Sequence, residues 1–403
     1  MRFGIFLAPF HPVTQDPNVA LHRDLELIQW LDQLGYDEAW IGEHHSAGYE
    51  IIASPEVFIA TAAERTRTIK LGTGVSSLPY HHPFILADRI VLLDHITRGR
   101  VMFGVGPGAL PSDAYMMGID PVDQRRRMEQ SLETMLGLFA GETVSAETDW
   151  FTMKDARLQL LPYTKPCFEI AVAAMISPSG PRLAGKHGLS LLSIGATQAE
   201  GFNAMANTWA IMEERSAEFG APVDRDNWRL VGPMHIAPTR EQAREDVKFG
   251  LAEWIDYFVR VAALPIVPPD MAVDNVVDTL VEGGFAVIGT PDDAVAQIER
   301  LEKQSGGFGT YLFMAHDWTD REATNLSYEL FARHVIPHFN ASTASTRASR
   351  DWVAENRPEQ LGRAGQAIYT AITEHAEEGR DTGKALKKAI EERFAGGQQQ
   401  QPS

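Results

Sequence analysis

Short apolar runs and amphipathic segments alternate eight times along this chain. The apolar runs have the length of strands, and each is followed by a segment whose hydrophobic residues recur at helical spacing. The expected strands are Arg2 to Leu7, Asp37 to Gly42, Lys70 to Val75, Val101 to Val105, Phe168 to Val172, Leu189 to Ile194, Trp228 to Ile236 and Gly309 to Met314. The expected helices are Leu21 to Leu34, Pro55 to Ala63, Phe84 to Ile96, Gln124 to Phe139, Pro181 to His187, Ala199 to Phe219, Arg240 to Ala262 and Arg321 to Ile336. Eight such units predict an α/β protein with a (β/α)8 TIM barrel.

Two segments do not fit the repeating unit. Ala263 to Phe285 is inserted before the eighth strand and carries three prolines and a Gly-Gly pair, so we expect a mobile lid over the barrel. Residues 340–395 are rich in Ala, Glu, Lys and Arg and predict a helical C-terminal arm, whereas the glutamine-rich residues 396–403 predict disorder. The barrel domain is therefore expected to span residues 1–339.

The composition narrows the classes of partner. The chain has 403 residues, 44% of them hydrophobic, and a formal net charge of −18, which disfavours nucleic acids and anionic membranes as partners. No apolar run approaches the roughly 20 residues of a membrane-spanning helix, and the start of the chain lacks the features of a signal peptide. The single cysteine, Cys167, excludes an internal disulfide and is expected to be a buried core thiol. We therefore expect a soluble cytoplasmic protein.

The second expected strand ends in Glu43, His44 and His45. Side chains at the carboxyl ends of barrel strands bind ligands, and an imidazole there can donate or accept a proton near neutral pH. A metal-dependent hydrolase could instead use these residues as ligands, but adjacent residues on a strand point to opposite faces, so His44 and His45 could not easily share an ion. His81 and His82 could line the same end of the barrel or lie in a solvated loop.

Turns rich in glycine and serine follow other strands. Gly104 to Ala109 matches the loose G-x-G-x-x-G/A pattern of dinucleotide sites, but two prolines disrupt the helix that this pattern requires, so a loop close to a flat ligand is expected. Ser177 to Pro181 precedes a helix, where free amides favour a phosphate, although an ordinary helix cap has the same sequence. Gly72 to Ser77 would let a planar ring lie against the backbone or form a simple strand exit. Arg125 to Arg127 are expected on a solvated helix face.

In this order, the segments resemble the bacterial luciferase-like flavin monooxygenases over about residues 1–338. The resemblance is carried by Arg2 to Leu7, Trp40 to His45, Leu71 to Gly74, Leu92 to Arg100, Phe103 to Gly106, Ile288 to Pro291 and His334 to His338. It implies a TIM barrel that binds reduced FMN and uses it to activate O2. The flavin would be supplied by a separate NAD(P)H-dependent flavin reductase, and the oxygen would enter a small apolar substrate, for example a monoterpene such as limonene.

The resemblance also implies roles for individual residues. His44 matches the catalytic histidine that protonates or holds the activated oxygen, and Glu43 matches a carboxylate at the flavin edge. The expected neighbours of the substrate or of the catalytic histidine are His45, His81 and His82. The positions that match the flavin site are Gly74 and Val75, joined by a cis peptide beneath the ring, and Ser177, Ser179 and Gly180 around the phosphate.

One position departs from the family pattern, because Pro107 stands where an arginine helps to hold the phosphate in luciferase itself. Weaker retention of free flavin would follow. Luciferase-like barrels usually pair through helices near the second and third strands, which implies a homodimer. Two alternatives share this barrel: a deazaflavin-dependent oxidoreductase that transfers hydride, and a non-catalytic flavin-binding relative.

Overall fold

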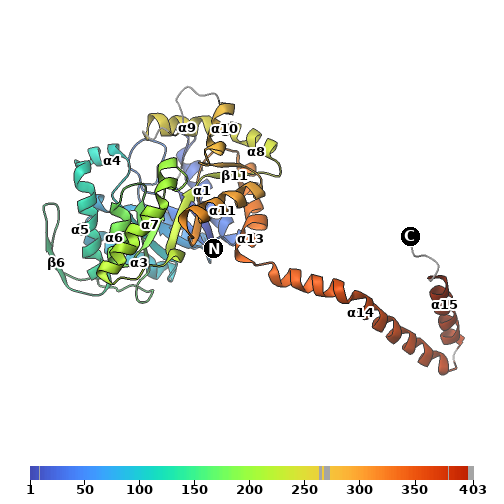
Figure 1. The fold of residues 1–403 in the computed structure, drawn as a ribbon. Coiled ribbons are helices and arrows are strands. Elements are labelled where there is room, and N and C mark those ends of the chain that lie inside the picture. Colours follow the sequence, from blue (N-terminus) through green and yellow to red (C-terminus); the bar gives the residue numbers. More distant parts are fainter. Residues whose placement is uncertain (9, 263–265, 267–272, 380, 398–403) are drawn as a thin grey trace. The chain divides into compact units, whose positions relative to one another are not determined.

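Eight parallel strands close into a barrel in the first unit of the chain, residues 1–340 of a computed structural model (Figure 1). Around the barrel they are β1 (Arg2–Leu7), β2 (Glu38–Ile41), β3 (Lys70–Thr73), β5 (Val101–Gly106), β8 (Glu169–Ala174), β9 (Ser190–Ser193), β10 (Trp228–Gly232) and β13 (Thr310–Met314). The ring closes because β13 pairs with β1 and β3 pairs with β5. The predicted TIM barrel is confirmed. The structure describes residues 1–8, 10–262, 266, 273–379 and 381–397.

Helices surround the barrel, and local sequence sets where they begin and end. The helices that follow the barrel strands include α1 (Pro17–Leu34), α2 (Pro55–Arg65), α3 (Pro83–Thr97), α5 (Pro121–Phe139), α6 (Ser179–His187), α7 (Ala199–Phe219), α11 (Pro291–Ser305) and α12 (Arg321–Leu330). Helix α1 begins where the Asp16 carboxylate accepts hydrogen bonds from the amides of Asn18 and Val19. It ends at Gly35, whose φ of 82° is the left-handed conformation that glycine adopts most readily.

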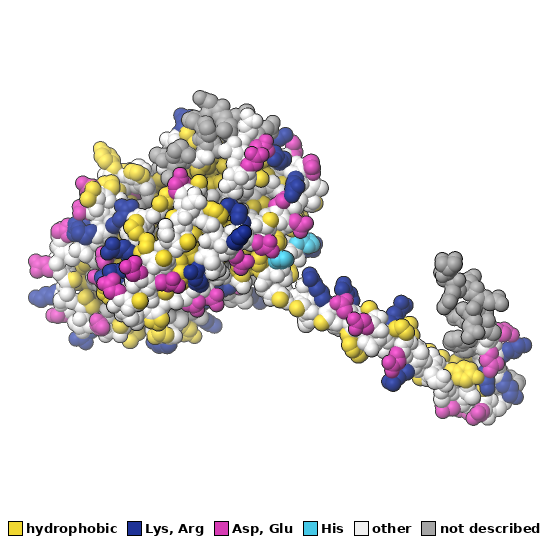
Figure 2. Space-filling model, in the orientation of Figure 1, with side chains coloured by type: hydrophobic (Ala, Val, Ile, Leu, Met, Phe, Trp, Pro, Cys, Tyr) yellow, Lys and Arg dark blue, Asp and Glu magenta, His cyan; other side chains and the backbone are white. Residues whose placement is uncertain are grey.

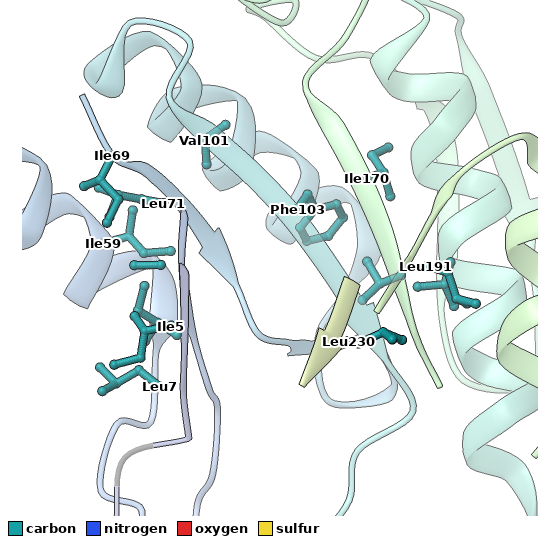
Figure 3. Close-up of a cluster of buried hydrophobic side chains, with 14 of the residues drawn as sticks. Ile5, Leu7, Ile59, Ile69, Leu71, Val101, Phe103, Ile170, Leu191 and Leu230 are labelled. Carbon is teal, nitrogen blue, oxygen red and sulfur yellow. The ribbon is translucent and has the colours of Figure 1, made fainter. Parts of the chain in front are cut away.

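The main hydrophobic core lies between the strands and the surrounding helices. Figure 3 shows Ile5 and Leu7 of β1 near Ile59 of α2 and Leu71 of β3, all of them almost fully buried. A second cluster fills the inside of the barrel and consists of Phe6, Trp40, Met102, Ala171, Leu192, Val231 and Leu312. Each large apolar side chain buried in this way contributes roughly 1.5 to 3 kcal/mol. The barrel is therefore a packed scaffold rather than a pore.

A buried ion cluster crosses the inside of the barrel. The Arg229 guanidinium of β10 donates from Nε to Glu38 Oε2 at 2.6 Å, and its Nη1 lies 2.7 Å from Glu169 Oε1. Trp40 Nε1 also donates to Glu38 at 2.9 Å, and Arg229 lies over the Trp40 ring at 4.9 Å from its centroid. Arg2 Nη1 also lies 3.5 Å from Glu38 Oε1. Because Arg229 and Glu38 are fully buried, their charges need the countercharges that this cluster supplies.

The predicted seventh strand, Trp228 to Ile236, is wrong as a single element. Strand β10 belongs to the barrel, whereas β11 (Met234–Ile236) pairs with β12 (Val287–Gly289) in a separate two-stranded sheet. The break falls at Pro233, which has no amide hydrogen to donate to a strand neighbour. The chain therefore leaves the barrel after β10 and forms an insertion before it returns as β13.

The predicted helix Arg240 to Ala262 is also divided. It consists of α8 (Arg240–Asp246), a 3-10 turn η3 (Val247–Phe249) and α9 (Leu251–Arg260). The break falls at Gly250, where an added Cβ would lie 1.9 Å from the Asp317 carbonyl oxygen. The predicted helix Arg321 to Ile336 is likewise divided, into α12, a π turn η4 (Phe331–Val335) and α13 (Ile336–Asn340).

Several elements were not predicted, and the cysteine is less buried than expected. The unpredicted elements outside the expected lid are β4 (Ser76–Ser77), η1 (Leu78–Tyr80), α4 (Pro111–Met116), the hairpin β6 (Val144–Glu147) and β7 (Thr152–Ala156), η2 (Arg225–Asn227), β12 and the 15-residue helix α11. Cys167 is half-buried against the core rather than enclosed by it. Burial raises the pKa of its thiol to about 11, so the thiol remains protonated at neutral pH.

The expected lid, Ala263 to Phe285, contains two different parts. Residues 263–265 and 267–272 lie outside the described residues. The remainder includes α10 (Val273–Glu282), in which Val276, Val277 and Leu280 are buried. They belong to a cluster that also contains Trp254 and Tyr257 of α9. Figure 1 shows α8, α9 and α10 together at one end of the barrel. Movement of the segment stays a prediction.

The second unit, residues 341–403, contains α14 (Ala344–Glu377) and α15 (Asp381–Gly397). Most side chains of α14 are exposed, including Trp352, Leu361 and Ile368, and the apolar ones lie among charged neighbours in Figure 2. Acidic and basic side chains are also interspersed over the visible face of the first unit (Figure 2). Residues 398–403 of the expected disordered tail lie outside the described residues. Within the described part of the chain, no helix is both long and apolar enough to cross a membrane.

Candidate functional site

The loop after β2 brings the three predicted acid and imidazole side chains to the carboxyl end of the barrel. Strand β2 ends at Ile41, and the Gly42 amide donates to the Leu7 carbonyl of β1 at 2.8 Å. An added Cβ on Gly42 would lie 3.3 Å from that carbonyl oxygen, which is a tight contact that would push the backbone of β1 by a few tenths of an ångström. Glycine therefore lets the loop turn over the end of β1, and Glu43 follows it directly.

Glu43 is a buried carboxylate that holds two imidazoles. Its Oε1 lies 2.9 Å from His45 Nε2 and 2.7 Å from His81 Nε2, and its Oε2 accepts from the Ser77 amide at 2.8 Å. Burial acts to raise the pKa of Glu43, but the hydrogen bonds from His45 and His81 outweigh it, so the net pKa is lowered. Glu43 is therefore charged and orients both histidines. The sequence placed His45 and His81 near this site without identifying their common partner.

His44 lies between two buried carboxylates. Its Nδ1 lies 3.2 Å from Asp113 Oδ2, and its Nε2 lies 3.2 Å from Glu50 Oε2. Burial acts to lower the pKa of His44, but the charges of Glu50 and Asp113 and the hydrogen bond to Asp113 outweigh it, so the net pKa is raised. The arrangement favours the protonated imidazolium, which is the form that can donate a proton.

Asp113 belongs to α4 and is almost fully buried. Besides His44, it accepts a hydrogen bond from the Ser46 hydroxyl and one from the His45 amide at 3.2 Å. Burial acts to raise the pKa of Asp113, and the hydrogen bonds from His44 and Ser46 outweigh it, so the net pKa is lowered. Neither Asp113 nor Glu50 was predicted as a site residue. Their only sequence signal is an acidic side chain in the segment between a barrel strand and its main helix.

The structure does not bring His82 into this cluster. His82 is exposed at the start of α3, with its ring edge toward Phe151 at a centroid distance of 6.0 Å. Its neighbour His81 turns inward to Glu43 instead. Adjacent residues in the extended segment before Pro83 point in different directions, which explains why only one of the two histidines reaches the site.

An apolar surface lies at the same end of the barrel. Ala8, Val75, Ile194 and Met314 are half-buried and pack on the cluster inside the barrel. The Gly74–Val75 peptide is cis, which confirms that expectation for the pair. An added Cβ on Gly106 would lie 2.6 Å from Val75 Cγ2, so a larger residue there would displace Val75. Glycine at position 106 thus leaves room for the Val75 side chain in this surface.

The two serines predicted to bind a phosphate lie at the start of α6. The hydroxyls of Ser177 and Ser179 lie 3.0 Å apart, at the helix end where free amides and the dipole favour negative charge. Gly180 lets the helix pack directly on β8, since an added Cβ would lie 2.7 Å from the Ala173 carbonyl oxygen. The two serines line a cavity together with Glu129 and the basic side chains Arg125, Arg126, Arg182, Lys186 and Arg215. Lys186 pairs with Glu129 and Glu133, and Arg215 pairs with Glu218.

Arg125 and Arg126 are exposed and Arg127 is half-buried, in keeping with the expected solvated helix face. Arg126 pairs with Asp123 and Asp149, and Arg127 lies over the Trp150 ring. Arg125, by contrast, lines the cavity beside Ser177 and Ser179, as does Arg182. Within the described ranges, neither Arg125 nor Arg182 has an acidic partner in the structure. Their charges are therefore free to meet an anion.

Together, these features suit a flavin mononucleotide. The apolar side chains could contact its ring and the cavity with two serines its phosphate, and His44 follows another barrel strand, β2. No group of three or more His, Cys, Asp or Glu side chains that could hold a metal ion occurs within the described residues.

Comparisons with known proteins agree with this geometry. A family model described as luciferase-like monooxygenase matches residues 1–307. A limonene 1,2-monooxygenase from Rhodococcus erythropolis is 52% identical over 338 residues, which are 84% of this chain and 86% of that protein. A 4-hydroxyprotoasukamycin monooxygenase from Streptomyces nodosus subsp. asukaensis is 45% identical over 367 residues, 90% of this chain and 99% of that protein.

A solved structure extends the similarity to three dimensions. The oxygenating constituent of 3,6-diketocamphane monooxygenase from Pseudomonas putida, in complex with FMN, has a TM-score of 0.72 and 26% sequence identity. The similarity covers 84% of this chain and 98% of that one.

Proposed function

Because this chain belongs to the luciferase-like monooxygenase family, we propose that it uses reduced FMN and O2 to insert one oxygen atom into a small apolar substrate. The observation that carries the proposal is the position of His44, whose ring lies between two buried carboxylates at the carboxyl end of the barrel. A proton donor at this end suits the chemistry of an oxygenase, in which an oxygen atom must be protonated as the O–O bond breaks.

The chain's own residues are suited to hold FMN. Ser177, Ser179 and the amide of Gly180 would bind the phosphate, with Arg125 and Arg182 as countercharges. The Gly74–Val75 segment would lie against the ring. When bound, reduced FMN supplies the two electrons that activate O2. Glu43 would act at one edge of the ring by fixing His45 and His81, and the apolar surface would limit access of water.

The apolar surface also supports an apolar substrate. Ala8, Val75, Ile194 and Met314 offer no hydrogen-bonding side chains, so a ligand above them would be recognised mainly by its shape. The 52% identity with a limonene 1,2-monooxygenase makes limonene the first substrate to test, with 1,2-epoxidation as the expected reaction. The related 3,6-diketocamphane enzyme is described as an oxygenating constituent, which supports a separate NAD(P)H-dependent reductase as the source of reduced FMN.

A homodimer is part of the proposal. Exposed apolar side chains lie on α2 and α3, the helices after the second and third barrel strands, at Val57, Ile85, Leu92 and Ile96. Pairing of two copies through these helices would remove this apolar area from water.

The test is a turnover assay with the full chain, a generic flavin reductase, NADH, FMN and 18O2. The substrate panel contains limonene, cyclic ketones and long-chain aldehydes, and products are scored by mass. One labelled oxygen atom in a product is the expected result, with the greatest yield from limonene. Deazaflavin-dependent oxidation without O2, or flavin binding without any oxygenated product across the panel, would contradict the proposal.

A further inference from the structure

Glu50 is a buried acid that the sequence did not mark as part of the site. It lies six residues after His44 in the loop that follows β2, and the residue is only 8% exposed. Its Oε2 is buried and has no hydrogen-bond partner among the described residues, yet it lies 3.2 Å from His44 Nε2. A buried carboxylate oxygen without a hydrogen-bond donor is costly, so an ionic partner for it is expected.

Tyr257 holds the other oxygen of this carboxylate. The Tyr257 hydroxyl of α9 donates to Glu50 Oε1 at 2.5 Å, across 207 positions of the sequence. Burial and the Glu50 charge raise the pKa of Tyr257, so the phenol keeps the proton that it donates. Tyr257 is itself buried among the aromatic rings of Phe10, Tyr49 and Phe258. Glu50 therefore has one oxygen fixed by a rigid donor and the other directed at His44.

We propose that Glu50 is a positioning residue for His44, and that Tyr257 fixes Glu50 so that its carboxylate holds the Nε2 side of the imidazole ring. The inference rests on the proposed function, in which His44 donates a proton. Asp113 holds the Nδ1 side of the ring, so the two carboxylates together determine its orientation and keep it charged. Since α9 belongs to the insertion between β10 and β13, the insertion acts on the reaction through Tyr257.

The charged and titratable groups around His44 come from three elements. Glu43, His45 and Glu50 share its loop, Asp113 is presented by α4, and Tyr257 reaches Glu50 from α9. Of these, Glu43 is occupied by His45 and His81. Loss of the Glu50 charge would therefore leave Asp113 as the single carboxylate in direct contact with the His44 ring.

The test measures the pKa of His44 by NMR in the flavin-free full chain labelled with 15N histidine. The His44 signals are assigned by their loss in His44→Gln. Glu50→Gln keeps an acceptor for Tyr257 and removes the charge, and loss of an opposite charge at this distance lowers the pKa of an imidazole by about one unit or more. Glu50→Asp restores the charge on a shorter side chain. The pKa of His44 in Glu50→Asp should therefore lie between its values in the wild type and in Glu50→Gln. Glu253→Gln removes a charge from α9 away from the ring and should leave the pKa unchanged.

An unchanged pKa of His44 in Glu50→Gln would overturn the proposal. Should that variant fail to fold, Tyr257→Phe carries the test, because an unanchored carboxylate spends less time beside His44 and the pKa should fall by a smaller amount. In that case, an unchanged pKa of His44 in Tyr257→Phe would contradict the proposal.

The same variants give a second readout during turnover. If His44 must be protonated, activity falls as the pH rises through its pKa, and Glu50→Gln should move this fall to lower pH. If the activity of Glu50→Gln falls at the same pH as that of the wild type, the proposal is contradicted. Absence of oxygenation in the wild-type chain would refute the proposed function alone, since the NMR titration uses neither flavin nor substrate.

Discussion

Replacement of His44 by glutamine tests the proposed role of the site most directly. Glutamine keeps much of the bulk of the imidazole and one N–H donor, but it cannot give up a proton. Loss of a positioned general acid lowers a rate by roughly 10² to 10⁴-fold, which corresponds to about 2.7 to 5.4 kcal/mol of transition-state stabilisation at 1.36 kcal/mol for each factor of ten. We expect His44→Gln to lose oxygenated product on this scale. FMN binding should remain near the wild-type level, because His44 is not among the residues that line the proposed phosphate site at the start of α6.

The same substitution should change stability in a way that depends on pH. The His44 side chain is 15% exposed and lies between Asp113 and Glu50, whose side chains are 1% and 9% exposed. Removal of one partner of a buried ion pair costs roughly 3 to 5 kcal/mol, and since glutamine can still donate to one carboxylate we expect the lower end, about 3 kcal/mol.

The sign of the pH dependence follows from the two pKa shifts. The pKa of His44 is raised in the folded protein, so its contribution is complete below its unfolded value of about 6.5 and is lost as the pH rises through the folded value. The pKa of Asp113 is lowered, so its contribution is present above its unfolded value and is lost as the pH falls through the folded value. The deficit of His44→Gln should therefore be largest near pH 6 and smaller at alkaline pH.

Two measurements decide the matter. Product per O2 consumed is followed by mass spectrometry, and the free energy of unfolding is followed by tryptophan fluorescence in urea at pH 6 and pH 9. A product yield within about threefold of the wild-type yield would refute the assignment of His44 as the proton donor, given the scale above. A stability deficit that is equal at both pH values would refute the ion-pair reasoning, even if activity were lost.

Three further outcomes are expected from other parts of the structure. Arg125→Ala combined with Arg182→Ala should raise the dissociation constant of FMN, measured by calorimetry, by roughly tenfold or more, since a hydrogen bond to a charged group contributes about 1.5 to 3 kcal/mol. The dissociation constant of riboflavin, which has no phosphate, should be the same in this variant as in the wild type. Arg229→Met should lower the free energy of unfolding by roughly 3 kcal/mol, the lower end of the range for a broken buried ion pair, because it leaves the buried Glu38 with only the half-buried Arg2, 3.5 Å away, as a countercharge. A urea midpoint equal to that of the wild type would contradict this. Leu92→Glu should convert the proposed dimer to a monomer in light scattering, whereas an unchanged mass would place the pairing surface elsewhere or exclude it.

The sequence determined the barrel and the location of its site. Strand β1 and helix α7 have the predicted bounds, Arg2–Leu7 and Ala199–Phe219, because the spacing of hydrophobic residues is a local signal. Glu43, His44 and His45 were placed correctly at the end of a strand for the same reason. The barrel rule then brings all strand ends to one side of the molecule, so a site at that end follows from strand positions alone.

The partners of His44 were decided by the tertiary structure. Asp113 lies 69 positions from His44 in the sequence, and Tyr257 lies 207 positions from Glu50. No periodicity or motif indicates which residues are in contact over such sequence separations. Arg125 is exposed and lines a cavity with Ser177 and Ser179, more than 50 positions away, so its local sequence could not indicate these neighbours. A residue type and its local spacing fix which element it belongs to, whereas the charge that it meets depends on how distant loops close over the barrel.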